Sequence, residues 1–250
     1  MGMPGLENPA PPNPENIREK KAKEVKIKKV EEVFHYAEAA MGTLVSELKE
    51  DIAGRRWDAF LSDDAGARLP SLVIWNIARR YAQERDQTPP KLLFFPGGRV
   101  LTYTPVTQEE LKLHFQDLTR EINGRVLLIT EHVSSGDSLK IESKLLEDAR
   151  LSHDVAVVSL AQWANRDKLE LFKFLPQDAK VYLGEHGPRE YFYRSNYAGV
   201  RKSHRPLEIV REVGADQETI IIVRAKAKEL ADKLYERYFV KKEQEVPAAA

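Results

Sequence analysis

The sequence predicts an α/β domain built on a single parallel β-sheet, with helices on both faces and helical extensions at both ends of the chain. Short apolar runs alternate with longer segments in which apolar residues recur at helical spacing. This alternation favours a parallel sheet, because each parallel neighbour is reached through a crossover helix. The chain has 250 residues and 42% hydrophobic content, which is enough for one core of this kind.

The expected elements follow from this pattern in chain order. The runs around Lys91-Leu92-Leu93-Phe94-Phe95 and Val126-Leu127-Leu128-Ile129 have the continuous apolar character of buried strands. Between them, Leu111, Phe115 and Ile122 fall on one side of an amphipathic helix. We expect strands at residues 60–61, 91–95, 126–130, 154–160 and 180–184, and helices at residues 69–84, 108–122 and 138–149.

The two ends of the chain differ from this core in composition. We divide the chain into a disordered Pro-rich tail (1–14), a helical N-terminal extension (15–56), a core (57–214), a C-terminal helix (215–240) and a frayed tail (241–250). Apolar residues from Val30 to Leu48 recur at helical spacing, so the N-terminal helix should pack on the core or on a partner chain. The two terminal helices make a homodimer plausible.

The charge and cysteine content exclude several classes of protein. Lys+Arg and Asp+Glu balance at 39 each, so the chain has no overall basic charge that would attract nucleic acid. It has no cysteine, which excludes disulfides, thiolate catalysis and Cys-based zinc sites. Lysines and glutamates alternate at residues 19–32. One interpretation is a basic arm that binds nucleic acid. We favour a solvated helix face of mixed charge, because the glutamates reduce the positive potential of the lysines. No apolar run approaches the ~20 residues of a membrane span, and no signal peptide is recognisable. We therefore expect a cytoplasmic protein with no membrane partner and no strong nucleic-acid signal.

The stretch from Arg125 to Leu139 is the most informative part of the sequence. An apolar strand ends in Thr130 and Glu131, at the edge where open α/β sheets bind their ligands. A small-residue loop then opens a helix, and backbone N–H groups at a helix N-terminus favour an anion such as phosphate. The loop residues are Ser134, Ser135, Gly136, Asp137 and Ser138.

This stretch resembles the phosphoribosyl pyrophosphate signature of type I phosphoribosyltransferases. The resemblance implies that Glu131 and Thr130 take the place of the acidic pair that binds the ribose hydroxyls, and that the loop at 134–138 cradles the 5′-phosphate. Thr130 departs from the family, which usually has a carboxylate there. Residues 60–70 and 193–201 are similar to two further segments of a little-characterised branch, one with an Asp-x-x-Ala-Arg-Pro-like loop and one with a late aromatic-Gly-Arg-Gly-Val-like segment.

The resemblance also implies a pyrophosphate site and a magnesium ion. Mg²⁺ would enter with phosphoribosyl pyrophosphate, held through water by Asp63 or Asp64 and indirectly by Glu131. The implied pyrophosphate-binding residues are Asp64, Ala65, Gly66, Arg68 and Arg99.

Each of these residues also has an alternative interpretation. Asp63 or Asp64 could cap the helix that follows, Arg99 could belong to a surface turn, and Ser134 or Ser135 could be an ordinary N-cap. His132 could transfer a proton near the reacting centre or be a linker within the motif, and we do not assign it as catalytic. The aromatic-basic cluster at residues 191–202 could stack on a base or simply cover the edge of the sheet.

The resemblance implies a glycosyltransferase-class enzyme that moves the phosphoribosyl group to a nitrogenous base and releases pyrophosphate. Its partner would be a small-molecule sugar phosphate or nucleotide. The alternative is a non-catalytic regulatory or sensor module on the same fold. A third possibility is another α/β enzyme of nucleotide metabolism, in which the loop binds a different phosphate.

Overall fold

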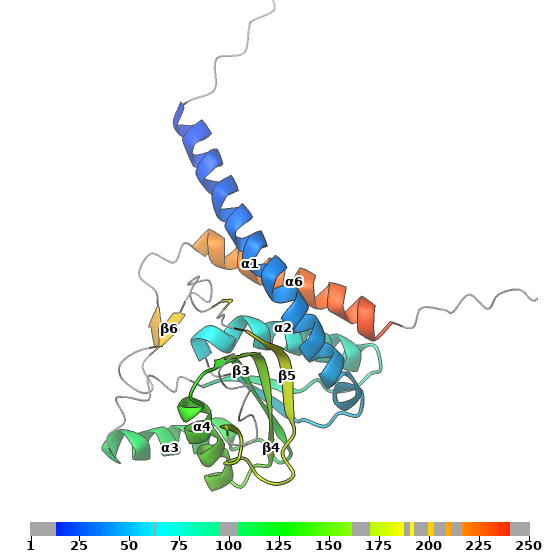
Figure 1. Ribbon diagram of the computed structural model, residues 1–250, viewed down its shortest axis with the longest axis vertical. Helices are drawn as coiled ribbons and strands as arrows, with labels where there is room; N and C mark the ends of the chain where they lie inside the picture. Colours follow the sequence, from blue (N-terminus) through cyan, green and yellow to red (C-terminus); the bar gives the residue numbers. More distant parts are fainter. Residues whose placement is uncertain are drawn as a thin grey trace, which may run out of the picture.

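As the sequence predicts, the computed structural model has an α/β fold with a five-stranded parallel sheet (Figure 1). The strands lie in the order β2-β1-β3-β4-β5. The structure describes residues 14–62, 64–95, 105–161, 171–187, 191–192, 200–202, 209–211 and 217–240. The strands of the sheet are β1 Ala59–Ser62, β2 Lys91–Phe94, β3 Val126–Val133, β4 His153–Leu160 and β5 Val181–His186. The helices are α1 Pro14–Ala53, α2 Asp64–Gln83, α3 Pro105–Thr119, α4 Asp137–Asp148 and α6 Gln217–Tyr238.

Several elements differ from the expected boundaries or were not expected. Strand β3 continues three residues past Thr130, because His132 and Val133 still pair with Ser159 and Leu160 of β4. Helix α2 begins at Asp64, five residues before the expected start. A short antiparallel pair, β6 Val200–Lys202 with β7 Ile209–Arg211, was not expected from the sequence.

The sheet separates two apolar layers. Alternate residues of a strand point to opposite faces, so Leu127 and Ile129 join one core cluster while Val126 and Leu128 join the other. The first cluster contains the buried sides of α1, α2 and α6, and the second contains those of α3 and α4. Both faces of the central strands are therefore covered, which accounts for their continuous apolar sequence.

Helix α1 covers β5, the edge strand of the sheet. A Cβ on Gly184 would lie 2.6 Å from the carbonyl oxygen of Ala40, so only glycine lets the helix approach this closely. Glu47 accepts a hydrogen bond from the backbone N–H of Leu183 at 2.8 Å. That contact satisfies an edge-strand donor, which would otherwise be open to pairing with another chain.

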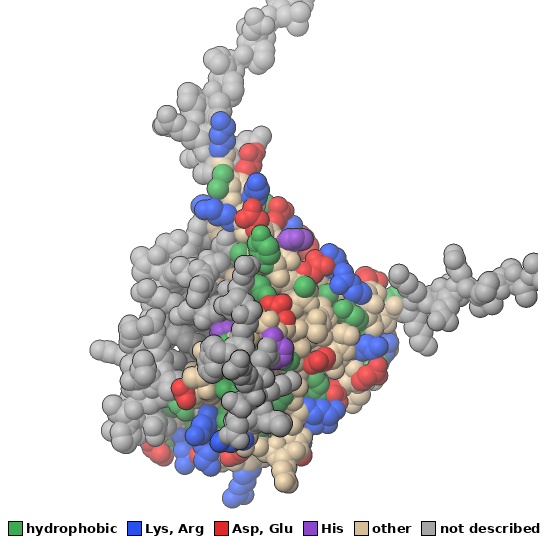
Figure 2. All heavy atoms as spheres, in the orientation of Figure 1, with side chains coloured by type: hydrophobic (Ala, Val, Ile, Leu, Met, Phe, Trp, Pro, Cys, Tyr) green, Lys and Arg blue, Asp and Glu red, His purple; other side chains and the backbone are tan. Residues whose placement is uncertain are grey.

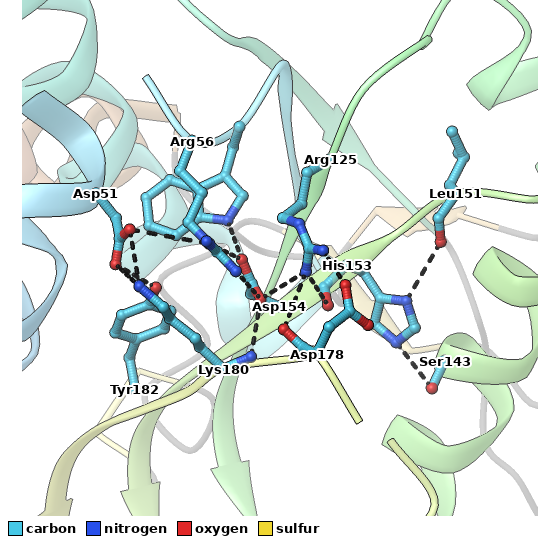
Figure 3. Close-up of polar contacts among 11 residues, drawn as sticks. Asp51, Arg56, Arg125, Ser143, Leu151, His153, Asp154, Asp178, Lys180 and Tyr182 are labelled. Atoms are coloured by element: carbon cyan, nitrogen blue, oxygen red, sulfur yellow. Dashed lines mark hydrogen bonds and ion pairs between the residues drawn. The ribbon is translucent and has the colours of Figure 1, made fainter. Parts of the chain in front are cut away.

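A buried ionic cluster lies at the amino ends of the strands (Figure 3). Asp154 of β4 is fully buried and accepts hydrogen bonds from Arg56 Nε at 2.6 Å, Trp57 Nε1 at 2.7 Å, Arg125 at 3.0 Å and the Lys180 backbone N–H at 2.8 Å. Burial alone would raise the pKa of Asp154, but these hydrogen bonds outweigh it and lower the pKa. The cluster fixes the segments that lead into β1, β3 and β5 around one carboxylate.

The neighbouring His153 gives the protein a pH-dependent stability. His153 is buried, its Nε2 lies 2.8 Å from Ser143 Oγ, and burial lowers its pKa from the usual 6.5. The unfolded chain therefore binds the proton more readily than the folded chain, so this stabilisation is complete above about pH 6.5 and is lost as the pH falls toward the folded-state pKa. We expect urea unfolding between pH 8 and 5 to show a decline of at most about 1.4 kcal/mol per pH unit from this group.

Substitution of His153 separates its contribution to the pH dependence from the contributions of the Asp and Glu side chains. His153→Gln should flatten the decline just below pH 6.5, whereas His186→Gln, at an exposed position, should leave it in place. An unchanged pH dependence in His153→Gln would contradict the assignment.

Candidate functional site

The corner between β3 and α4 lies at the carboxyl edge of the sheet, as the sequence predicts. The N-cap of α4 is Gly136, with φ +81° and no side-chain capping bond, so neither serine is the N-cap. A Cβ at Gly136 would lie 3.1 Å from Leu171 Cδ1, which together with the positive φ requires glycine. The first helical N–H, that of Asp137, donates a long hydrogen bond of 3.5 Å to Ser135 Oγ. The helix thus begins next to small hydroxyl side chains.

The loop is accessible from solvent. Ser134, Ser135 and Asp137 are exposed, and Gly136 and Ser138 are half-buried. Backbone donors, hydroxyls and the positive end of the α4 dipole therefore face the same open corner, and such a corner can bind a phosphate without a dedicated cation.

Thr130 and Glu131 lie beneath this surface. They are 4% and 3% exposed, and because β3 continues past them their side chains point to opposite faces of the sheet. Glu131 lies on the side of Leu127 and Ile129, where its Oε1 accepts a hydrogen bond from the backbone N–H of Phe192. Phe192 is fully buried against Phe34 of α1, with the two ring centroids 5.3 Å apart. Glu131 therefore anchors the segment Tyr191–Phe192 in this structure.

The sequence-predicted pyrophosphate residues lie at the start of α2. Asp64, Ala65, Gly66 and Arg68 fall in its first turns rather than in a loop before it. The guanidinium of Arg68 stacks 4.4 Å above the ring of Phe94, at the carboxyl end of β2. The prediction for Arg99 and the magnesium alternative for Asp63 lie outside the described residues.

Ser62 is a residue of this edge that sequence reasoning missed. It ends β1, pairs in register with Ile129, and is fully buried. Its hydroxyl has no hydrogen-bond partner among the described residues. A serine at the end of an apolar strand is the sequence signal that could have identified it. A buried hydroxyl without a partner is costly, so a ligand or a water at this edge would stabilise it.

A row of polar side chains crosses the carboxyl ends of three neighbouring strands. His132, Ser159 and Glu185 are paired in register on β3, β4 and β5 and share one face. Ser159 Oγ donates a hydrogen bond to the Gly187 carbonyl at 3.2 Å, so its contact of 3.4 Å with His132 Nδ1 requires that nitrogen to carry the proton. Glu185 accepts a hydrogen bond from the hydroxyl of Tyr191. The signal in the sequence is a polar residue interrupting each apolar run.

The predicted aromatic cluster is described only in part. Phe192 belongs to the core, which agrees with the packed-edge alternative for that residue, while Tyr191 is half-buried and reaches Glu185. The stretch 193–199 lies outside the described residues. Tyr191 and Phe192 contact carboxylates from β5 and β3, so this short segment spans the edge of the sheet beside the loop.

A cavity of about 490 Å³ lies at the opposite, amino-terminal edge of the sheet. Trp57, Pro90, Lys91 and Glu121 are among its lining residues. Several of its charged groups are already paired, including Lys91 with Glu121 at 2.7 Å and Arg56 with Asp154. We therefore place the candidate site at the carboxyl edge, which holds the N-terminus of α4 and the Ser62 hydroxyl, a group with no hydrogen-bond partner among the described residues.

No group of three His, Cys, Asp or Glu side chains that could hold a metal ion occurs among the residues that the structure describes. Within the same part of the chain, no helix combines the length and the apolar composition that a bilayer crossing requires.

Comparison of the chain with protein-family models, with curated proteins and with solved structures gives no match. The structure itself shows an α/β fold with a five-stranded parallel sheet, in which the left-handed Gly136 joins β3 to α4.

Proposed function

We propose that the protein binds phosphoribosyl pyrophosphate at the carboxyl edge of the sheet and transfers its phosphoribosyl group to a nitrogenous base, with release of pyrophosphate. The observation that carries the proposal is the corner at β3–α4, in which the exposed Ser134 and Ser135 precede a left-handed glycine at the N-terminus of α4. This corner supports binding of the 5′-phosphate through backbone N–H groups and hydroxyls.

The ribose would lie above Thr130 and Glu131. A carboxylate has about four acceptor positions, so Glu131 could accept ribose hydroxyls as well as the N–H of Phe192. Because Glu131 is almost fully buried, binding requires the segment Tyr191–Phe192 to shift or to share the carboxylate. Thr130 adds a neutral hydroxyl where the resembled family has a second acid.

The pyrophosphate would lie toward the first turn of α2. Orphan N–H groups of that turn and the guanidinium of Arg68 would stabilise the negative charge that develops on the leaving group. We treat Mg²⁺ as part of the substrate, because magnesium on a pyrophosphate keeps mostly water and phosphate ligands. As the bond from ribose C1 to the pyrophosphate oxygen breaks, the base nitrogen bonds to C1 and loses its proton.

The second candidate is a sensor that binds the same ligand without turnover. Two observations favour it: Thr130 replaces an acid, and Glu131 is already engaged with Phe192. Both functions require binding, and only the enzyme releases pyrophosphate when a base is added.

Gly136→Ala tests the phosphate corner directly. An L-residue at φ +81° costs about 1–2 kcal/mol, and the new Cβ would press on Leu171, so the loop must rearrange. We expect calorimetric affinity for ribose 5-phosphate to fall at least tenfold.

The matched control is Gly42→Ala, where the nearest atom is the Tyr238 hydroxyl at 3.4 Å and the helix tolerates alanine. It should bind as the wild type does. If Gly136→Ala keeps its fold by circular dichroism and its affinity is unchanged, phosphate does not bind at this corner.

A further inference from the structure

Helix α1 carries opposite charges in its two halves. Residues 14–29 contain seven Lys or Arg and three Glu, a net charge of +4. Residues 30–53 contain one Lys and six Asp or Glu, a net charge of −5. Such a helix is complementary to an antiparallel copy of itself, because each basic half then lies along an acidic half.

Much of the basic half extends beyond the rest of the protein, although Lys23 pairs with Glu218 of α6 (Figure 1). Burial of α1 begins at Val30, whereas the described side chains before it are exposed or half-buried. Helix α6 occupies one flank of α1, where Lys226 pairs with Glu31 at 3.3 Å and Lys233 pairs with Glu38 at 2.7 Å. The face of α1 that points away from both α6 and the sheet is open to solvent, and Figure 2 shows positive, negative and hydrophobic side chains together along this ridge.

The open face has the spacing of a helix-pairing seam. Its exposed residues recur at alternating intervals of four and three, which is the repeat that keeps two helices in contact. Val25 and Tyr36 are the large apolar members, 55% and 58% exposed. The seam consists of Val25, Lys29, Glu32, Tyr36, Ala39 and Thr43.

This seam matches itself when reversed. If two antiparallel copies cross midway between Val30 and Glu31, Val25 lies opposite the second copy's Tyr36, and Lys29 lies opposite the second copy's Glu32. Neither Lys29 nor Glu32 forms an ion pair within the described part of the chain, so both can pair across the interface. The same contacts occur twice, as a two-fold interface requires.

We propose that the seam binds a second copy of this chain, forming an antiparallel two-fold dimer through α1. A polyanion such as nucleic acid would be attracted by residues 14–29 but would pair with neither Glu32 nor the exposed apolar side chains of Val25 and Tyr36. A membrane surface needs a broad apolar face, and this seam alternates apolar and charged residues. A second copy satisfies both charges and covers Val25 and Tyr36.

Charge exchange tests the dimer in the full-length protein. Sedimentation velocity at about 50 mM salt should show a dimer that weakens in 1 M salt, where exposed charges are screened within about 3 Å. Lys29→Glu and Glu32→Lys should each weaken the dimer at least tenfold. The double exchange should restore it, because the antiparallel register places the two exchanged residues opposite each other. Lys144→Glu, on α4 and far from the seam, is the control and should leave the dimer unchanged.

Three results would overturn the proposal. The wild type could remain monomeric at 100 µM; the dimer could persist in both single exchanges; or the monomer could be retained by duplex DNA, which would make the arm a nucleic-acid contact. None of these readouts depends on phosphoribosyl pyrophosphate, so the dimer and the proposed function can fail independently.

Discussion

Asp154→Ala is expected to lower the free energy of unfolding by about 3–5 kcal/mol, because removing one partner leaves the rest of a buried ionic cluster uncompensated. The guanidinium groups of Arg56 and Arg125 would lose their common acceptor, and the indole N–H of Trp57 and the backbone N–H of Lys180 would lose theirs (Figure 3). Urea unfolding followed by circular dichroism measures the loss.

Asp178→Ala is the matched control for this exchange. Asp178 also pairs with Arg125, but its side chain is 63% exposed, and such surface pairs contribute little to stability because solvent screens them. A loss below 1 kcal/mol in Asp154→Ala would show that the cluster does not stabilise the amino edge of the sheet.

Exchanges at Glu131 are expected to separate its structural role from its ligand role. In Glu131→Ala the buried N–H of Phe192 loses its acceptor, which should cost about 1–3 kcal/mol of stability and abolish ligand binding. In Glu131→Gln the side-chain carbonyl can still accept that N–H, so most of the stability should remain. The negative charge and half of the acceptor capacity are lost, so affinity for phosphoribosyl pyrophosphate should still fall at least tenfold.

Thermal unfolding and calorimetry on both variants check this separation. Wild-type affinity in Glu131→Gln would make Glu131 a purely structural residue. Equal losses of stability in both variants would show that the charge itself holds the segment Tyr191–Phe192.

The strands, the helices and the parallel character of the sheet were predictable because their determinants are local. Apolar runs such as Val126–Ile129 and Asp154–Leu160 specify buried strands, and the helical stripes between them specify crossovers. The glycine in the loop was also readable, although its role as a left-handed N-cap became clear only with the neighbouring Leu171 in place.

The contacts of the site were not predictable, because they join residues far apart in the chain. Glu131 is bonded to a residue 61 positions away, and Arg56 reaches Asp154 over 98 positions. The row of His132, Ser159 and Glu185 exists only through the register of three strands. The burial of Glu131 was not predictable for the same reason, because the segment Tyr191–Phe192 that contacts it is distant in the sequence.

The most direct test of the proposed function is calorimetric titration of the wild-type protein with phosphoribosyl pyrophosphate, with and without Mg²⁺. We predict saturable binding at one site per chain that is stronger with magnesium and is weakened by Gly136→Ala. Absence of binding in both conditions would contradict the proposal and leave the corner at β3–α4 as a structural feature of the fold.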